Sequence, residues 1–241
     1  MSAPDSQNLS NRFRFLAEAT AWLFRSQGVF IRWKVRDKLL SDPFYRSLLG
    51  TGRLPTEGVA IDLGCGRGVL LAFWSRAMAL GMIGGSKRGT KMRLIGIDAD
   101  PEAVKSASLA LTDEAEIFTG DLRTFSLPEC HVAILQNVLL FLETDEQEAL
   151  LSRIASCLEV GGCIILHEPD AANVAYRAMA RLPGNVFGLF FGNRHQSLHP
   201  RSGEDWKILL QSLGLQVETM PVNQGQWLPN ISLLARKTHL S

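Results

Sequence analysis

The chain has 241 residues, 46% of them hydrophobic and 20% charged, which is typical of a folded globular protein and excludes the disordered class. Its formal net charge of +1 at pH 7 gives no broad positive field, so a nucleic-acid substrate is disfavoured. Residues 1–10 lack the pattern of a secretory signal and no apolar run is long enough to span a bilayer, so we expect a cytoplasmic protein without a membrane span.

Predicted helices and strands alternate along most of the chain. Apolar residues at helical spacing among Arg and Lys predict one or two amphipathic helices at 12–40. Short apolar runs predict strands at 59–63, 94–97, 117–118, 131–135, 163–166, 216–219 and 231–235. Helical spacing predicts helices at 69–80, 101–109, 147–158 and 206–213. The alternation indicates an α/β fold with a mostly parallel sheet and helices on both faces, which binds ligands at the carboxyl ends of its strands.

The strongest chemical signal is the segment Asp62-Leu63-Gly64-Cys65-Gly66-Arg67-Gly68, between the first predicted strand and a helix. Glycines at this place let the backbone turn sharply and approach a ligand closely. A second acid, Asp98, ends the next predicted strand, where a carboxylate can accept hydrogen bonds from both hydroxyls of a ribose. Together these residues predict a site for a ligand that contains a nucleoside.

The pattern resembles the glycine-rich motif of the class I, Rossmann-like S-adenosylmethionine-dependent methyltransferases. The resemblance implies a Rossmann-like, mostly parallel seven-stranded sheet and S-adenosyl-L-methionine as the cofactor. The residues that it implies in cofactor binding are Asp62, Gly64, Cys65, Gly66, Asp98, Ala99, Asp121, Leu122 and Asn137.

The same resemblance implies a role for each polar residue of that set. Asp62 would lie near the amino group of the methionine part, and Asp98 would hold the ribose. Asp121 would accept from the exocyclic amine of adenine, beside Leu122, and Asn137 would close the site next to the sulfonium.

On this basis residues 1–241 are expected to form a single methyltransferase domain. Its parts are an N-terminal helical cap at about 10–50, a cofactor-binding core at about 57–168, a substrate cover insertion at about 170–202 and C-terminal strands at 203–241.

The sequence leaves two other classes open. An NAD(P)-dependent oxidoreductase would need the third glycine of its fingerprint where this chain has Val69. A protein that binds S-adenosylmethionine without transferring its methyl group would carry the same glycine motif. No metal site is expected, because the four cysteines lack CxxC spacing and the pair His195 and His199 lacks a third ligand.

A base assists methyl transfer when the acceptor is a hydroxyl, whereas alignment and exclusion of water supply much of the rate. The predicted catalytic residues are His167, at the end of a predicted strand, and His195, in the predicted cover. Glu168 and His199 are further candidate bases, and a purely structural histidine is the alternative interpretation of His167.

The first helices are rich in aromatic residues. The set comprises Phe13, Phe15, Trp22, Phe24, Phe30 and Trp33. It indicates either a seam packed against the rest of the domain, which we favour, or part of an acceptor pocket.

A narrower resemblance lies at the two ends of the chain. The segment 30–39 with Asp42-Pro43, and the segments 198–201 and 230–235, are similar to methyltransferases associated with bacterial aryl polyene pigment clusters. The similarity implies a small-molecule acceptor, with a hydroxyl or phenolic oxygen on an aromatic or polyene-type metabolite, which a carrier protein can present. We interpret the basic segment 84–93 as a solvated surface loop, and docking of such a carrier is the alternative interpretation.

The chain departs from these relatives at two positions. Leu140 stands where a histidine is expected, and Asn137 stands where an aspartate is frequent. Both departures weaken the assignment of a base, and the sequence does not predict an oligomeric state.

Overall fold

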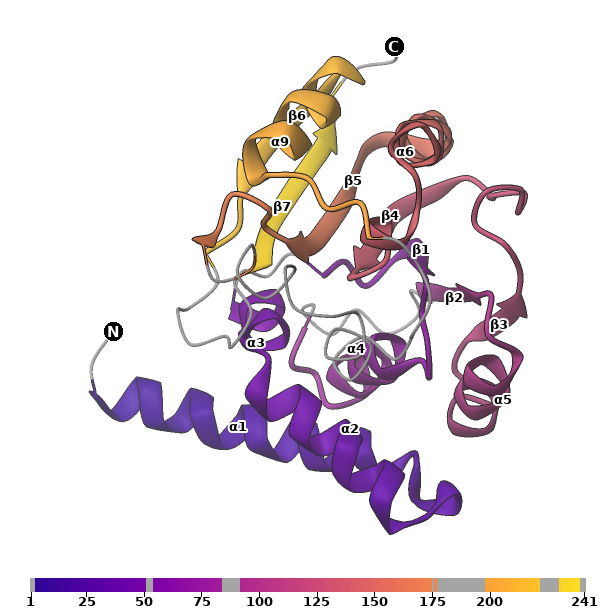
Figure 1. The fold of residues 1–241 in the computed structure, drawn as a ribbon. Coiled ribbons are helices and arrows are strands. Elements are labelled where there is room, and N and C mark those ends of the chain that lie inside the picture. Colours follow the sequence, from indigo (N-terminus) through magenta and orange to yellow (C-terminus); the bar gives the residue numbers. More distant parts are fainter. Residues whose placement is uncertain are drawn as a thin grey trace. The chain divides into compact units, whose positions relative to one another are not determined.

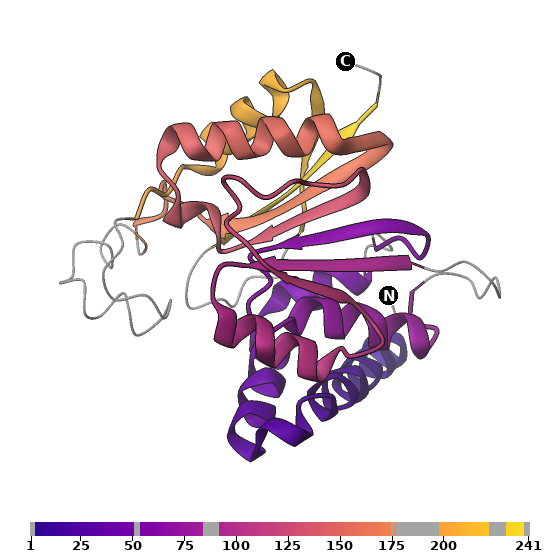
Figure 2. The same cartoon turned by 90° about the vertical axis from the view of Figure 1, so that its right-hand side faces the viewer.

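The structure is a computed structural model that describes residues 3–50, 54–83, 92–174, 176, 198–221 and 230–238. Seven strands form a sheet in the order β3-β2-β1-β4-β5-β7-β6 (Figures 1 and 2). The pairs β1 with β2, β2 with β3 and β4 with β5 are parallel, whereas β7 runs antiparallel to β5 and β6. The predicted seven-stranded, mostly parallel sheet of a Rossmann-like fold is therefore confirmed. No helix in the described part of the chain is long and apolar enough to cross a membrane.

The chain divides into two compact units, the first of which comprises residues 1–121 and 222–225. Its elements are α1 (Ala3–Trp22), η1 (Arg25–Gln27), α2 (Val29–Ser41), α3 (Pro43–Gly50), β1 (Gly58–Leu63), α4 (Val69–Ala79), β2 (Met92–Asp98), α5 (Pro101–Ala110) and β3 (Glu116–Thr119). The start of α5 follows the expected pattern, because Pro101 is its first residue and the side chain of Asp100 accepts a hydrogen bond from the Glu102 N–H.

Aromatic packing joins the N-terminal helices to α4. The ring of Phe73 makes edge contacts with Phe13 of α1 at 6.2 Å and with Tyr45 of α3 at 5.3 Å between centroids. Phe13, Tyr45 and Phe73 are all buried, so this cluster forms part of the unit's core. The helices that precede β1 are thus integrated into the first unit.

The second unit comprises residues 122–221 and 226–241. Its elements are β4 (Cys130–Gln136), η2 (Leu139–Phe141), α6 (Thr144–Cys157), β5 (Leu158–Pro169), α9 (Gly203–Ser212), β6 (Leu215–Thr219) and β7 (Asn230–Lys237). Reciprocal hydrogen bonds cap the first turns of α6 and α9, from Glu143 with Glu146 and from Ser202 with Asp205.

Strand β5 is longer than the sequence predicts. The glycines at 161 and 162, which look like a turn between a helix and a strand, lie inside β5, where the register with β4 shifts between Cys130 and Val132. Gly161 has φ of 84°, and a Cβ on Gly162 would stand 2.9 Å from the carbonyl oxygens of Glu159 and His131. The two glycines therefore form a bulge in a continuous strand.

Candidate functional site

The glycine-rich segment after β1 is a sharp bend that is tied to the end of β2. Gly64, Gly66 and Gly68 have φ of 77°, 53° and 75°, values that side-chain-bearing residues rarely adopt. The N–H groups of Gly64 and Cys65 both donate to the carbonyl oxygen of Ile97, at 2.8 and 3.0 Å. These bonds hold the bend against the last residues of β2.

Two glycines of the bend serve different purposes. A Cβ on Gly66 would meet no described atom within 4 Å, so this face of the bend is open. A Cβ on Gly68 would stand 2.9 Å from Leu111 Cδ1 and 3.0 Å from Ala107 Cβ. Gly66 thus leaves space beside the backbone for a ligand, whereas Gly68 lets α4 begin in close contact with α5.

Asp98 faces the bend and is held there by main-chain groups. Its Oδ2 accepts a hydrogen bond of 2.7 Å from the Gly66 N–H, and its Oδ1 accepts one of 2.9 Å from the Asp100 N–H. Its carbonyl oxygen accepts from the Gly120 N–H at 2.9 Å. A carboxylate has about four lone-pair positions, so each oxygen can accept one further hydrogen bond.

Asp62 lies beneath the bend with an exposed fraction of only 3%. Burial raises the pKa of its carboxyl group to about 7; the Lys38 ammonium lowers it in part, and the negative charge of Asp98 raises it further. Burial also raises the pKa of the Cys65 thiol, which donates to the Gly66 carbonyl oxygen at 3.7 Å. Cys65 is therefore a neutral, structural thiol, and Asp62 changes charge near neutral pH.

The first unit brings most of the predicted cofactor residues together. Besides the bend and Asp98, it holds Ala99, which is exposed, and Asp121, which follows the Gly120 bonded to Asp98. Leu122 and Asn137 belong to the second unit, and their roles stay predictions.

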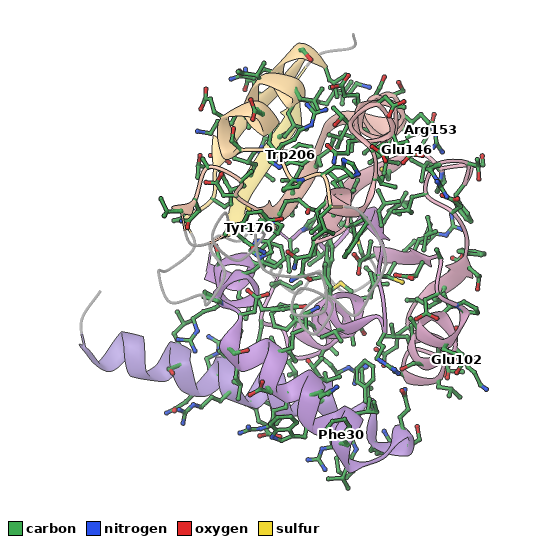
Figure 3. All side chains as sticks on the ribbon, viewed as in Figure 1. Phe30, Glu102, Glu146, Arg153, Tyr176 and Trp206 are labelled. Atoms are coloured by element: carbon green, nitrogen blue, oxygen red, sulfur yellow. The ribbon has the colours of Figure 1, made fainter. Side chains whose placement is uncertain are left out.

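An arginine that the sequence analysis did not single out fixes the chain around Leu122. Nη1 of Arg153, on α6, donates to the carbonyl oxygens of Leu122 and Arg123 at 2.9 and 2.8 Å, and Nη2 donates to that of Phe125 (Figure 3). One guanidinium thereby holds three successive parts of this segment in place.

In the second unit, Asn137 follows β4 in a strained conformation. Its φ is 56°, and no other non-glycine residue in the described part of the chain has a positive φ. Its N–H donates to the His167 carbonyl oxygen at 2.9 Å, and its Oδ1 accepts from Asn230 Nδ2 at 2.7 Å. Strain of this kind clusters at functional sites, and asparagine tolerates it better than most residues. Sequence spacing gave no signal for Asn230, because it is 93 positions away.

Glu168 supports the segment that begins at Asn137. Its Oε1 accepts from the N–H groups of Val138 and Leu139 at 2.7 and 2.9 Å. Its Oε2 is buried and has no hydrogen-bond partner among the described residues. Burial raises the pKa of Glu168 to about 7, although the bonds from Val138 and Leu139 lower it, and a carboxyl group of this kind can exchange a proton near neutral pH.

The structure describes only one of the two predicted catalytic histidines, His167. The His167 side chain is fully buried, and its Nδ1 lies 2.6 Å from Oγ of Ser232, its register partner on β7. His195 lies outside the described residues. His199 Nε2 is 3.3 Å from Glu143 Oε1. The catalytic roles of His167 and His195 stay predictions.

No cluster of three or more His, Cys, Asp or Glu side chains that could hold a metal ion occurs in the described ranges.

Sequence comparison matches the central part of the chain to a known family. Residues 60–162 match the profile of the family described as "Methyltransferase domain". A curated relative, carboxy-S-adenosyl-L-methionine synthase from Sodalis glossinidius, is 27% identical over 130 residues, which make up 51% of this chain and 49% of the relative. The chain therefore spans about half the length of the curated relatives that it matches.

Solved structures with the same fold are methyltransferases. Human N-acetylserotonin methyltransferase in complex with S-adenosylmethionine has a TM-score of 0.59 at 21% identity, over 87% of this chain and 55% of that one. An O-methyltransferase family 2 protein from Planctomyces limnophilus, in complex with apigenin, has a TM-score of 0.55 at 18% identity, over 86% of this chain and 66% of that one. The matched segment includes most of β1, the glycine bend and Asp98. Residues 60–162 thus match a methyltransferase domain, and the chain shares its fold with solved methyltransferases, one of them in complex with S-adenosylmethionine.

Proposed function

We propose that the chain transfers a methyl group from S-adenosylmethionine to a hydroxyl or phenolic oxygen of a small aromatic or polyene-type molecule. The observation that carries the cofactor part is the open bend at Gly66, whose N–H donates to Asp98. The acceptor part is supported by the aryl polyene resemblance and by the similarity in fold to an O-methyltransferase family protein bound to apigenin. A cytoplasmic location belongs to the same proposal.

The geometry of the bend fits the cofactor. The unused acceptor positions of Asp98 suit the two ribose hydroxyls, and the space beside Gly66 suits a ligand that lies against the backbone. We assign the cationic amino group of the cofactor to Asp62, and the burial of this acid below the bend supports the assignment. When bound, the cofactor supplies an activated methyl group on a sulfonium. The chain's own part is to hold the donor and to align the acceptor oxygen with it.

Three residues of the chain are candidates for the general base that would deprotonate a hydroxyl acceptor. His167 and His195 are the proposed bases, and the buried carboxyl of Glu168 is the alternative that its raised pKa supports. Single substitutions by Gln at His167, His195 and Glu168 distinguish these candidates. The residue that acts as the base is the one whose replacement lowers kcat and removes the acidic limb of the pH profile while leaving cofactor affinity unchanged.

The proposal also includes an acceptor that a carrier protein presents. The basic segment 84–93, which is the candidate docking site, lies mostly outside the described residues. The guanidinium of Arg93 is bonded to Glu116 at 2.6 and 2.7 Å, so it contributes little free positive charge to such a surface.

A ligand-binding experiment tests the cofactor part of this function against an oxidoreductase. Saturating S-adenosylhomocysteine should raise the melting temperature of the chain, because a ligand at about 100 times its Kd adds about 2.7 kcal/mol of stability. NADH and NADPH at the same concentration should leave it unchanged. A shift with NADH alone refutes the proposal. Turnover of a methyl-labelled donor with phenolic acceptors then distinguishes a methyltransferase from a protein that only binds the cofactor.

A second candidate is carboxylation of S-adenosylmethionine itself, in which CO2 released by a carboxylic-acid co-substrate replaces one hydrogen of the cofactor, and this hydrogen leaves as a proton. The observation that favours it is the 27% identity to a curated relative named a carboxy-S-adenosyl-L-methionine synthase, over about half of each chain. Mass spectrometry of the nucleoside product separates the two reactions. S-adenosylhomocysteine indicates methyl transfer, whereas a product heavier than S-adenosylmethionine by the mass of CO2 indicates the second reaction.

A further inference from the structure

The two N-terminal helices meet in a hairpin tip that exposes large apolar side chains. We use the name hairpin tip for residues 22–34, from the end of α1 through η1 to the first half of α2. Trp22, Val29, Phe30 and Trp33 have exposed fractions of 53%, 86%, 63% and 54%. The rings of Phe30 and Trp33 stack on each other at 6.2 Å between centroids, and Phe30 projects at the outer end of the hairpin (Figure 3).

This exposure divides the aromatic set of the first helices into two groups. Phe13 and Phe24 are buried, as expected for a packed seam, whereas the exposed members of the set are Phe15, Trp22, Phe30 and Trp33. Exposed aromatic residues that gather at one place mark interaction surfaces, because each exposed ring leaves apolar area in water.

Cationic side chains accompany the exposed rings. The guanidinium groups of Arg25 and Arg32 lie 5.5 and 4.8 Å from the centroid of Trp22, and the Lys34 ammonium lies 4.6 Å from that of Phe30. Residues 9–41 carry seven Lys or Arg and two Asp or Glu, although the whole chain has 25 and 24. The helices that present the rings thus carry an excess of positive charge.

The combination of cations and rings decides between possible partners. A second copy that docked by the same surface would bring like charges together, which costs free energy. An acidic water-soluble protein would match the cations but has no general need for protruding rings. The headgroup region of an anionic bilayer offers phosphates to the cations and an apolar boundary to Trp, Phe and Val.

We propose that the hairpin tip binds the surface of an anionic lipid bilayer. Phe30 and Trp33 lie at the level of the headgroups and acyl boundary, while Arg25 and Lys34 contact lipid phosphates. A bilayer-bound enzyme of this kind reaches acceptors that dissolve in the membrane. The binding itself does not depend on methyl transfer.

Flotation of the purified full-length chain with lipid vesicles tests the proposal. The chain should float with vesicles that contain about one third phosphatidylglycerol and not with pure phosphatidylcholine, and 0.5 M salt should release it. The fluorescence of the exposed tryptophans should shift to the blue on binding. No flotation with the anionic vesicles, or equal flotation with the neutral ones, overturns the proposal.

Surface variants assign the binding to the tip. Lys34→Glu should weaken vesicle binding by about tenfold, and the double variant F30S/W33S should weaken it at least as much. Leu109→Ser is the matched control, because Leu109 is 57% exposed on α5 of the same unit. All variants should keep the thermal shift with S-adenosylhomocysteine. Unchanged flotation of both tip variants overturns the proposal, as does binding of the tip to an acidic carrier protein but not to vesicles.

Discussion

Replacing Asp98 by alanine should remove most of the affinity for the cofactor and its product. The carboxylate is positioned before any ligand arrives, since its two oxygens are bonded to the N–H groups of Gly66 and Asp100 at 2.7 and 2.9 Å. The remaining acceptor position on each oxygen is available to one ribose hydroxyl. The variant loses the two bonds to the ribose, and it also leaves the Gly66 and Asp100 N–H groups without their acceptor.

The expected loss follows from the strength of such bonds. A hydrogen bond to a charged group contributes about 1.5–3 kcal/mol, so two of them contribute about 3–6 kcal/mol. Asp98 is partly exposed, which favours the lower end of that range. Since about 1.4 kcal/mol corresponds to a factor of ten, the Kd for S-adenosylhomocysteine should rise by about 100-fold.

Calorimetric titration with S-adenosylhomocysteine measures this change, and Asp100→Asn is the matched control. Asn keeps the helix cap at position 100, where the aspartate side chain accepts from Glu102 at 2.9 Å, but it removes the same unit of charge two residues from Asp98. The control should bind within about threefold of the original chain if hydrogen bonding dominates over general electrostatics. An unchanged Kd in Asp98→Ala, or an equal loss in the control, refutes the assignment of Asp98 to the ribose.

Four further predictions concern the bend and the buried carboxyl groups. Gly68→Ala should destabilise the chain by about 2–4 kcal/mol in urea unfolding, because it combines a left-handed φ with contacts of 2.9 and 3.0 Å. Gly66→Ala should cost only about 1 kcal/mol of stability yet abolish the thermal shift with S-adenosylhomocysteine; the reverse pattern contradicts the division of roles. Affinity for S-adenosylhomocysteine should fall as the pH drops below about 7, because the protonated Asp62 cannot pair with an amino group, and Asp62→Asn should flatten this dependence in titrations from pH 5.5 to 8.5. The raised pKa of Glu168, about 7, means that its contribution to stability is present at low pH and is lost as the pH rises from about 4.5 to 7. Relative to the original chain, Glu168→Gln should therefore gain about 3 kcal/mol of unfolding free energy between pH 4 and pH 8, and a constant difference would contradict this.

Local sequence patterns were sufficient to predict the alternating strands and helices of the fold. Buried strands read as short apolar runs, and the acid that ends β2 could be placed beside the bend, since parallel strands present their carboxyl ends at one edge. The structure confirms the seven strands and bonds Asp98 to Gly66. These features depend on residues close in sequence or on the general geometry of parallel sheets.

Features created by tertiary packing could not be predicted from the sequence. The glycines at 161 and 162 carry the same signal whether they end a strand or form a bulge within it, and only the pairing of β5 with β4 decides. The contact between Asn137 and Asn230 joins positions 93 residues apart. Helical spacing placed Phe13 and Phe30 in one stripe, but the first packs against Phe73 while the second faces outward. Helical spacing shows which side chains share one face of a helix. It does not show how far along that face another element covers them.

The structure also gives a physical reason for the feature of the glycine motif that separates it from a dinucleotide fingerprint. In that fingerprint the third glycine allows close packing of the helix that follows the bend. Here the glycine stands one residue earlier, at Gly68, and its missing side chain accommodates Leu111 and Ala107. Val69 is then free to be the first residue of α4 and is itself buried. Gly68 already provides the close packing between the bend and α5. Glycine is therefore not required at the next position, and Val69 is compatible with a tight bend. An acid beside the bend, such as Asp98, is common to both ligand classes. The feature that favours the proposed ligand is then Asp62, the buried acid beneath the bend, which the proposed function pairs with a cationic amino group.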